Sequence, residues 1–182
     1  MSKFPLEPQF AKSIIISALF DHHEPMITLM SMLSTESIFK RVLRINEEEY
    51  EEFLQSQKKF FSTTGDHETL LKIYEGWIKC EDPDEYCDAN FLNFRALRQT
   101  DNIKNQLYEI LNNNVNLENC RKQFLKDANY EKFIELKKNY KEKDNMPEEY
   151  VRTILRRNLA MSFYYNTARL TNNEEAYMLN YP

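Results

Sequence analysis

The sequence predicts a mainly α-helical protein, and three observations support this fold class. Glycine occurs only twice in 182 residues, at Gly65 and Gly76, which disfavours sheets joined by many tight turns. Apolar residues make up 42% of the chain and aromatic residues 13%, which is enough bulky side chain for a packed core. Apolar residues also recur at the three- and four-residue spacing of amphipathic helices. We therefore expect one helical bundle.

The first two predicted helices are strongly apolar. The first covers residues 8–19 and opens at Pro8, after a lead that contains Pro5. The second starts near Pro25, a residue that a first helical turn tolerates. Apolar residues follow from Met26 to Leu33 almost without a polar interruption, so we expect protein on every side of this helix.

Two amphipathic helices are expected next. Residues 46–61 carry acidic residues in the first turn and lysines near the end, an order that complements the helix dipole. The expected apolar face of this helix comprises Tyr50, Phe53, Leu54, Gln57 and Phe61. Gly65 permits a turn, and Asp66 is expected to cap a helix that continues to residue 79, with an apolar face of Leu70, Leu71, Tyr74, Trp77 and Ile78. The acidic run at 47–52 is interpreted as a solvated helix start.

The second half of the chain is expected to contain further helices and a hairpin. One helix opens at Pro83, and Thr100 is expected to cap another, in which apolar residues recur as far as Val115. Residues 117–145 predict two more helices, and Pro147 precedes a long one. Residues 166–182 contain Asn172 and Asn173 between two short strand-like runs, which predicts a β-hairpin.

Several chemistries are not supported by any group of residues. The chain has no Gly-rich loop ending in Lys-Ser or Lys-Thr, the phosphate cradle of nucleotide hydrolases. Cys80, Cys87 and Cys120 lack metal-ligand spacing and are interpreted as reduced thiols. We expect no catalytic residue, no metal site and no bound cofactor. No apolar stretch approaches the ~20 residues of a membrane helix, so we expect a soluble intracellular protein.

Charge limits the partners of the chain. The net charge is -5, but residues 121–157 contain more basic than acidic residues. A net acidic protein binds polyanions poorly, because affinity for a nucleic-acid backbone comes largely from cations that displace counterions. Any RNA contact must therefore be local. Tyr164, Tyr165 and Arg169 mix aromatic and cationic groups near the end of a predicted helix and are candidates for such a contact.

Five blocks, taken in order, resemble the helicase-associated region that follows the winged helix in DEAH-box RNA helicases, with the spliceosomal and ribosome-assembly members nearest in character. They are FPLEPQFAKSIIIS at 4–17, GDHETLLKIYEGW at 65–77, YCDANFLNFRALR at 86–98, TDNIKNQL at 100–107 and RTILRRNLAMSFYYNTARL at 152–170. The turn Gly-Asp-His before an apolar helix, together with the proline-containing opening, is the most distinctive part. Two departures stand out: Gln99 and Asp101 where many relatives are more basic, and residues 112–147, which look longer than the usual connection.

The resemblance implies a ratchet-like helical bundle at residues 1–165 and the start of a truncated oligonucleotide-binding barrel (OB-fold) at 166–182. Residues 112–147 are either a Lys-rich insertion or a solvated helix surface. The resemblance also implies a noncatalytic module that contacts single-stranded RNA. This module would couple to the motor and winged-helix domains of an ATP-dependent helicase, and only the motor domains would bind ATP and Mg²⁺. Protein cofactors are further implied partners, in a nuclear or additionally cytoplasmic protein that serves pre-mRNA splicing or ribosome assembly.

The candidate RNA-binding residues are cations and one aromatic ring on two predicted helices and the tail. They are Arg95, Arg98, Lys104, Arg156, Arg157, Tyr164 and Arg169. Lysine and arginine would contact phosphates, and Tyr164 could stack on a base. For each arginine, a salt bridge within the bundle is an equally good interpretation. The alternative function is a free-standing helical module that binds a protein, derived from a helicase tail.

Overall fold

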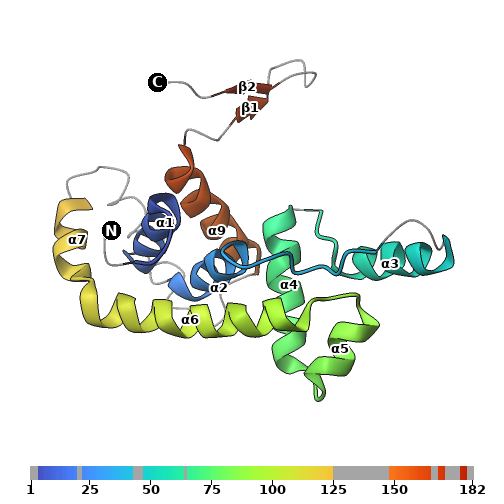
Figure 1. The fold of residues 1–182 in the computed structure, drawn as a ribbon. Coiled ribbons are helices and arrows are strands. Elements are labelled where there is room, and N and C mark those ends of the chain that lie inside the picture. The colour runs from blue at the N-terminus through green and yellow to red at the C-terminus, as the bar shows by residue number, and fades with distance from the viewer. Residues whose placement is uncertain are drawn as a thin grey trace. The chain divides into compact units, whose positions relative to one another are not determined.

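The computed structural model describes residues 4–19, 22–42, 47–63, 65–124, 148–164, 168–170 and 177–179. Its helices are α1 (Pro8–Leu19), α2 (His23–Leu33), α3 (Glu47–Phe60), α4 (Asp66–Lys79), α5 (Pro83–Ala89), α6 (Phe94–Asn114), α7 (Leu117–Phe124) and α9 (Glu148–Ser162), as shown in Figure 1. The mainly helical fold class is thus confirmed. The chain divides into two compact units, Ile27–Glu109 and Met1–Met26 with Ile110–Pro182.

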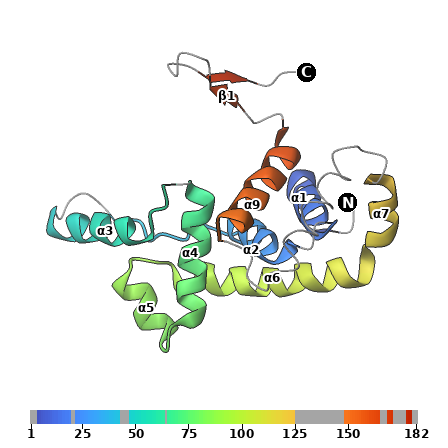
Figure 2. The same ribbon diagram turned by 180° about the vertical axis from the view of Figure 1, so that it is seen from behind.

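The unit formed by the two ends of the chain is built on α1 and α9. These helices lie side by side in both ribbon views (Figures 1 and 2). The rings of Phe10 and Phe163 meet with centroids 5.8 Å apart, which joins α1 to the residue that follows α9. Helix α1 buries Ala11, Ile14 and other small or branched residues, in agreement with its predicted apolar character.

The Ile27–Glu109 unit has one apolar core centred on α4. Its buried members are Met32, Ile38, Ile73, Tyr74, Trp77, Cys87, Leu92, Ala96 and Leu97. They come from α2, α4, α5, the start of α6 and the segments between them, so residues distant in the sequence share one core. The predicted apolar positions Tyr74 and Trp77 of α4 are buried, whereas Ile78 is 54% exposed. Ile78 is therefore a correction to the expected apolar face.

The segment after α2 is held against the start of α6 by backbone hydrogen bonds. The Lys40 N–H donates to the Phe91 carbonyl over 2.9 Å, and the Asn93 N–H donates to the Ile38 carbonyl over 2.7 Å. An isolated bridge pairs Phe39 with Leu92. Lys40 Nζ also forms an ion pair with Asp88 Oδ1 at 2.6 Å. These contacts fix Phe39 beside α3 and α4.

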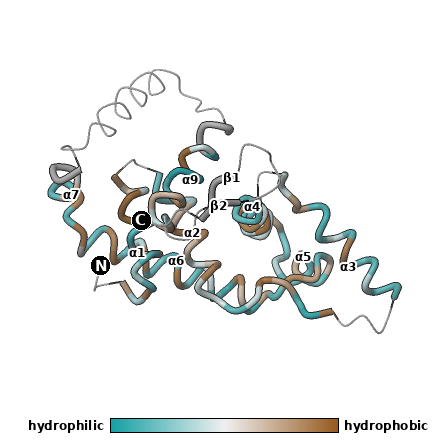
Figure 3. Tube along the Cα trace, turned by 90° about the horizontal axis from the view of Figure 1, so that it is seen from above, coloured by the Kyte–Doolittle hydropathy of each residue, from teal (hydrophilic) through white to brown (hydrophobic). Residues whose placement is uncertain are grey.

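Helix α6 begins earlier than the sequence predicted. The expected N-cap, Thr100, is fully buried inside the helix, and its hydroxyl donates to the Ala96 carbonyl over 3.0 Å. The capping role belongs to Asn93, whose side-chain Oδ1 accepts from the Ala96 N–H at 3.2 Å. Both Thr and Asn are capping residues by type, and only the packing decides between them. The trace of α6 alternates between hydrophilic and hydrophobic residues in Figure 3, as an amphipathic helix requires.

Helix α3 packs through only part of the face that the sequence predicted. Phe53 meets the ring of Phe91 edge-on at 5.8 Å, and the Ser56 hydroxyl donates to the Asn90 carbonyl over 3.0 Å. Leu54 and Phe61, which were expected on the apolar face, are instead 40% and 64% exposed. Their burial was predicted wrongly because Phe53 and Ser56, and not Leu54 and Phe61, make the contacts of this segment with the loop after α5. The acidic residues 47–49, 51 and 52 are exposed, as predicted.

Two further expectations concern the turn before α4 and the chain after α7. Asp66 is the first residue of α4 rather than its cap; the cap position is Gly65, whose φ of +130° favours glycine. Strands β1 (Ala168–Leu170) and β2 (Tyr177–Leu179) pair antiparallel, with Arg169 opposite Met178. A truncated barrel and the division at residue 165 stay predictions. Most of the Lys-rich 112–147 segment, including its second predicted helix, lies outside the described residues.

Among the described residues, no helix is both long enough and apolar enough to cross a membrane.

The close approach of α5 to α4 at Gly76 gives a test of the core. A Cβ at Gly76 would overlap the Tyr86 hydroxyl and ring. We predict that Gly76→Ala lowers the free energy of unfolding by about 1–3 kcal/mol in urea titrations. In a helix with open space, the same change would raise it by up to about 1 kcal/mol. Tyr86→Phe removes the overlapping oxygen, so Gly76→Ala should do less harm in that background. A stabilising Gly76→Ala would contradict this packing.

Candidate nucleic-acid interface

Arg95 and Arg98 lie on the exposed side of α6, three residues apart and therefore on one helix face. The neighbouring residues Ala96 and Leu97 are buried in the core, which fixes the rotation of the helix about its axis. Neither arginine takes part in an ion pair within the part of the chain that the structure describes. Within the described residues, the salt-bridge interpretation of these two arginines therefore has no support.

The exposed side of α6 continues the two arginines with amides. The exposed residues between 95 and 106 are Arg95, Arg98, Gln99, Asn102, Asn105 and Gln106, which we call the α6 polar face. No exposed position in this range is acidic, and the next exposed acid is Glu109. Sequence reasoning named Gln99 only as a departure from the family and missed the other three amides, although their spacing opposite the buried apolar residues could have identified them. Arginine and amide side chains together contact phosphates, sugars and base edges.

Lys104 does not belong to the α6 polar face. Nine residues separate it from Arg95, which at about 100° per residue places the two on opposite sides of the helix. Its ammonium lies over the Tyr74 ring, 4.9 Å from the centroid. The Tyr74 hydroxyl donates to Asp101 Oδ1 over 2.7 Å. Lys104 and Asp101 thus both contact Tyr74 of α4, so Asp101 adds no exposed acid to the polar face.

The remaining candidates lie on the other unit. Arg156 is exposed on α9, and its Nε donates weakly to the Arg152 carbonyl over 3.4 Å. Tyr164 follows the end of α9, about two helical turns after Arg156, and is 49% exposed. Arg157 is half-buried and has contacts of its own. Arg169 is the middle residue of β1. The seven candidates therefore fall into two groups, one on each compact unit.

The cysteines do not form a second site. Cys87 is fully buried, and the Cys80 thiol donates to the Trp77 carbonyl over 2.9 Å. The described residues contain no group of three or more His, Cys, Asp or Glu side chains that could hold a metal ion. Burial, reinforced by the neighbouring Cys80, raises the pKa of the Cys87 thiol from an ordinary value of 9.0 to about 11. A buried neutral thiol is a poor nucleophile and a poor metal ligand.

Comparison with known proteins connects this fold to RNA helicases. Residues 7–70 match the family described as "Helicase associated domain (HA2), ratchet-like". The chain is 36% identical over 110 residues to ATP-dependent RNA helicase DHX33 of Drosophila melanogaster. It is 37% identical to the proteins of the same name from Mus musculus, over 111 residues, and Homo sapiens, over 110. Each match covers 60% of this chain but only 15% of the relative.

These findings confirm the resemblance to the helicase-associated region of DEAH-box RNA helicases, whereas the spliceosomal type stays a prediction. The family match covers α1, α2, α3 and the start of α4. The α6 polar face and α9 lie outside the 7–70 match, so the roles of their residues have to be argued from the structure.

The raised pKa of Cys87 gives a prediction for alkaline solution. The unfolded thiol loses its proton near pH 9, whereas the folded thiol keeps it to about pH 11. The contribution of this thiol to the free energy of unfolding is therefore fully present below pH 9 and is lost between pH 9 and pH 11. Burial also raises the pKa of Tyr86, which acts in the same direction. We predict that the urea midpoint falls between about pH 9 and pH 11, and falls less steeply in Cys87→Ala.

Cys120→Ala is the matched control, since Cys120 is only partly buried on α7. It should leave the pH dependence of the urea midpoint unchanged. An equal slope in the wild type and Cys87→Ala would refute a buried neutral thiol at this position.

Proposed function

We propose that this chain is a noncatalytic C-terminal module of an ATP-dependent DEAH-box RNA helicase, and that it contacts single-stranded RNA. The α6 polar face carries this proposal. It presents two arginines without ion-pair partners among the described residues, flanked by four exposed amides and no exposed acid. The match of residues 7–70 to a helicase-associated domain supports the choice of RNA over other polyanions.

The chemistry of the α6 polar face suits a single strand. Arginine guanidinium groups bind phosphates in a bidentate manner and also stack on bases. Asparagine and glutamine can donate to and accept from base edges or the ribose hydroxyl. The net charge of -5 means that attraction to RNA is confined to such a local cationic face. Binding should therefore be weak, salt-dependent and oriented.

The second group of candidates extends the proposal to the other unit. Arg156 and Tyr164 are both exposed, and a cation together with an aromatic ring is the combination that single-strand binding proteins use along a backbone. Arg157, Lys104 and Arg169 are assigned supporting roles, since Lys104 already contacts Tyr74 and Arg157 has partners of its own.

Further parts of the proposal concern the rest of the helicase. The module would follow the movements of motor and winged-helix domains that are not in this chain, and those motor domains would bind ATP and Mg²⁺. This chain would bind no cofactor and would not hydrolyse ATP by itself. Pre-mRNA splicing or ribosome assembly would be the process, in the nucleus and additionally in the cytoplasm. The relatives are themselves named as ATP-dependent RNA helicases.

A free-standing protein-binding module is the alternative function. The exposed side chains of Leu54 and Phe61 favour it, because neighbouring exposed apolar residues commonly mark a protein interface. Absence of RNA binding even at low salt, together with a stable complex with a protein, would decide for this alternative.

Neutralising the two arginines of the α6 polar face tests RNA contact. We predict that Arg95→Gln with Arg98→Gln weakens binding of a fluorescent single-stranded RNA, measured by anisotropy. If each arginine neutralises one phosphate, the slope of log affinity against log salt should decrease in magnitude by about 1.4.

Lys59→Gln with Lys72→Gln is a control of equal charge change. Both lysines are exposed and lie outside the α6 polar face, on α3 and α4. This variant should keep the wild-type salt slope. If the two variants weaken binding equally, attraction is a matter of net charge, and the face has no specific role.

A further inference from the structure

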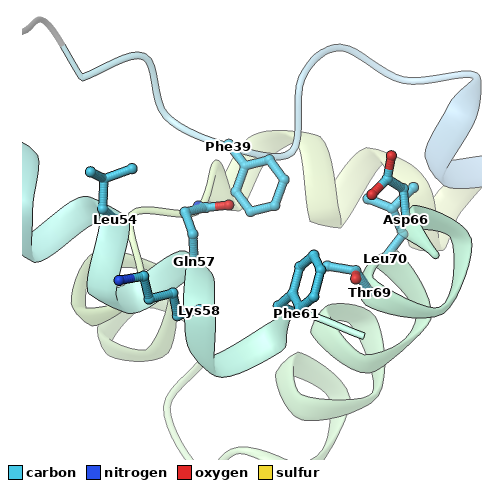
Figure 4. A pocket seen from close by; sticks show the side chains of 8 residues that line it. All are labelled: Phe39, Leu54, Gln57, Lys58, Phe61, Asp66, Thr69 and Leu70. Atoms are coloured by element: carbon cyan, nitrogen blue, oxygen red, sulfur yellow. The ribbon is translucent and has the colours of Figure 1, made fainter. Parts of the chain in front are cut away.

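An apolar groove lies between α3 and the start of α4, within the Ile27–Glu109 unit. Its volume is about 450 Å³, and it is lined by Phe39, Leu54, Gln57, Lys58, Phe61, Asp66, Thr69 and Leu70. Figure 4 shows the rings of Phe39 and Phe61 in the middle, Leu54 and Lys58 toward one end, and Asp66, Thr69 and Leu70 toward the other. Phe39 and Leu70 pack against the core of the unit, so the base of the groove is continuous with that core.

The side chains of Leu54 and Phe61 make this groove unlike an ordinary surface depression. They are 40% and 64% exposed although they are large and apolar. Leu54 lies in α3 and Phe61 directly follows its last residue, Phe60, so the two residues are separated by about two helical turns of α3. A helix that lies in a groove uses anchors with this repeat, at i, i+3 or i+4, and i+7. The spacing therefore fits a helical partner better than a compact small molecule.

The charges around the groove indicate which helix it would accept. Glu47, Glu51, Leu54 and Lys58 recur at three- and four-residue spacing and thus follow one line along α3, and Phe61 is the residue after the end of this helix. Glu47 and Glu51 are exposed and extend this line beyond Leu54, while Asp66 lies toward the other end. Carboxylates thus flank the apolar centre on both sides. The one cation in the lining, Lys58, lies beside Leu54.

We propose that this groove binds an amphipathic helix of a partner protein, with apolar anchors flanked by lysine or arginine. The apolar residues of the partner would cover Leu54, Phe61 and Phe39, and its cations would face Glu47, Glu51 and Asp66. The Gln57 amide nitrogen also lines the groove, and it is buried without a hydrogen-bond partner among the described residues. A small rotation would let it donate to an oxygen of the partner.

RNA is the wrong ligand for this groove. The carboxylates at the ends of the groove would repel the phosphates of RNA, and the α6 polar face provides the cations and amides that RNA needs. The proposal therefore goes beyond RNA contact and does not depend on it. Two large side chains give a small interface, so binding should be weak and transient.

Three synthetic peptides of about 14 residues, or four helical turns, test the proposal with the full chain. All three have leucine anchors at i, i+3 and i+7 and differ only in the residues that flank the anchors. The flanks are lysine and arginine in the basic peptide, serine and glutamine in the neutral peptide, and glutamate in the acidic peptide. We expect the basic peptide to bind best in anisotropy, the neutral one about tenfold more weakly, and the acidic one not at all. Equal binding of all three would overturn the proposed partner chemistry.

Variants of the groove locate the binding. Leu54→Ser with Phe61→Ser should weaken the basic peptide at least about tenfold, because it removes both exposed anchors. The matched control is Ile78→Ser, since Ile78 is an exposed apolar residue of α4 outside the groove lining. It should leave binding unchanged. Retained affinity in the Leu54 and Phe61 variant would refute the groove as the site.

A second double variant keeps the test valid if the variant with serine at positions 54 and 61 does not fold. Glu47→Gln with Glu51→Gln changes only exposed positions and should reduce the preference for the basic over the neutral peptide. An unchanged preference would contradict the charge argument. If the chain forms a dimer in sedimentation and the dimer disappears in the Leu54 and Phe61 variant, a second copy of the chain occupies the groove. If that variant loses RNA binding, RNA occupies the groove. Either result would overturn the proposal.

Discussion

The burial of Ala96, Leu97 and Thr100 determines which residues α6 presents to solvent. All three are fully buried, and Thr100 is held within the unit by a hydroxyl contact with Thr35 at 3.4 Å. The Asp101 carboxylate accepts from Tyr74 beside them. With these residues fixed inward, helical geometry requires Arg95, Arg98 and the amides to lie outward. The rotation of a single helix thus creates the surface on which the proposed RNA contact depends.

Two surfaces of the Ile27–Glu109 unit differ in chemistry in a way that separates their ligands. The α6 polar face combines cations with amides and has no exposed acid between residues 95 and 106. The groove beside α3 combines apolar side chains with Glu47, Glu51 and Asp66 at its two ends. A polyanion is attracted to the first and repelled by the second, whereas a basic amphipathic helix shows the opposite preference. Under the two proposals, a chain with a net charge of -5 would bind RNA and a protein through separate surfaces.

Periodicity in the sequence predicted where most helices lie but not how they pack. The apolar repeat correctly indicated α1, α2 and α4, because burial on one side of a helix requires residues at that spacing. It failed at Leu54 and Phe61, since the side of α3 that is covered depends on the distant residues Asn90 and Phe91. The start of α6 was misplaced for a similar reason. Thr100 is a good cap by residue type, but it is fully buried within the helix.

The candidate site was predictable in composition more than in arrangement. Arg95 and Arg98 are neighbours because three residues form nearly one helical turn, which the sequence alone indicates. Lys104 was grouped with them although nine residues place it opposite Arg95, and its contact with Tyr74 depends on the packing of α4 against α6. None of the four amides was a candidate, because a search for cations ignores neutral hydrogen-bonding groups. Arg156 and Tyr164 belong to a separate compact unit, which no local pattern indicated.

The central claim is that this chain contacts single-stranded RNA through α6 and the end of α9. Ultraviolet crosslinking of the full chain to a single-stranded RNA, followed by mass spectrometry of the crosslinked peptides, tests this claim most directly. The account predicts crosslinks in peptides that contain residues 95–106 and at Tyr164, with few in α3. Crosslinks concentrated in residues 47–70, or no crosslinking at low salt, would contradict it.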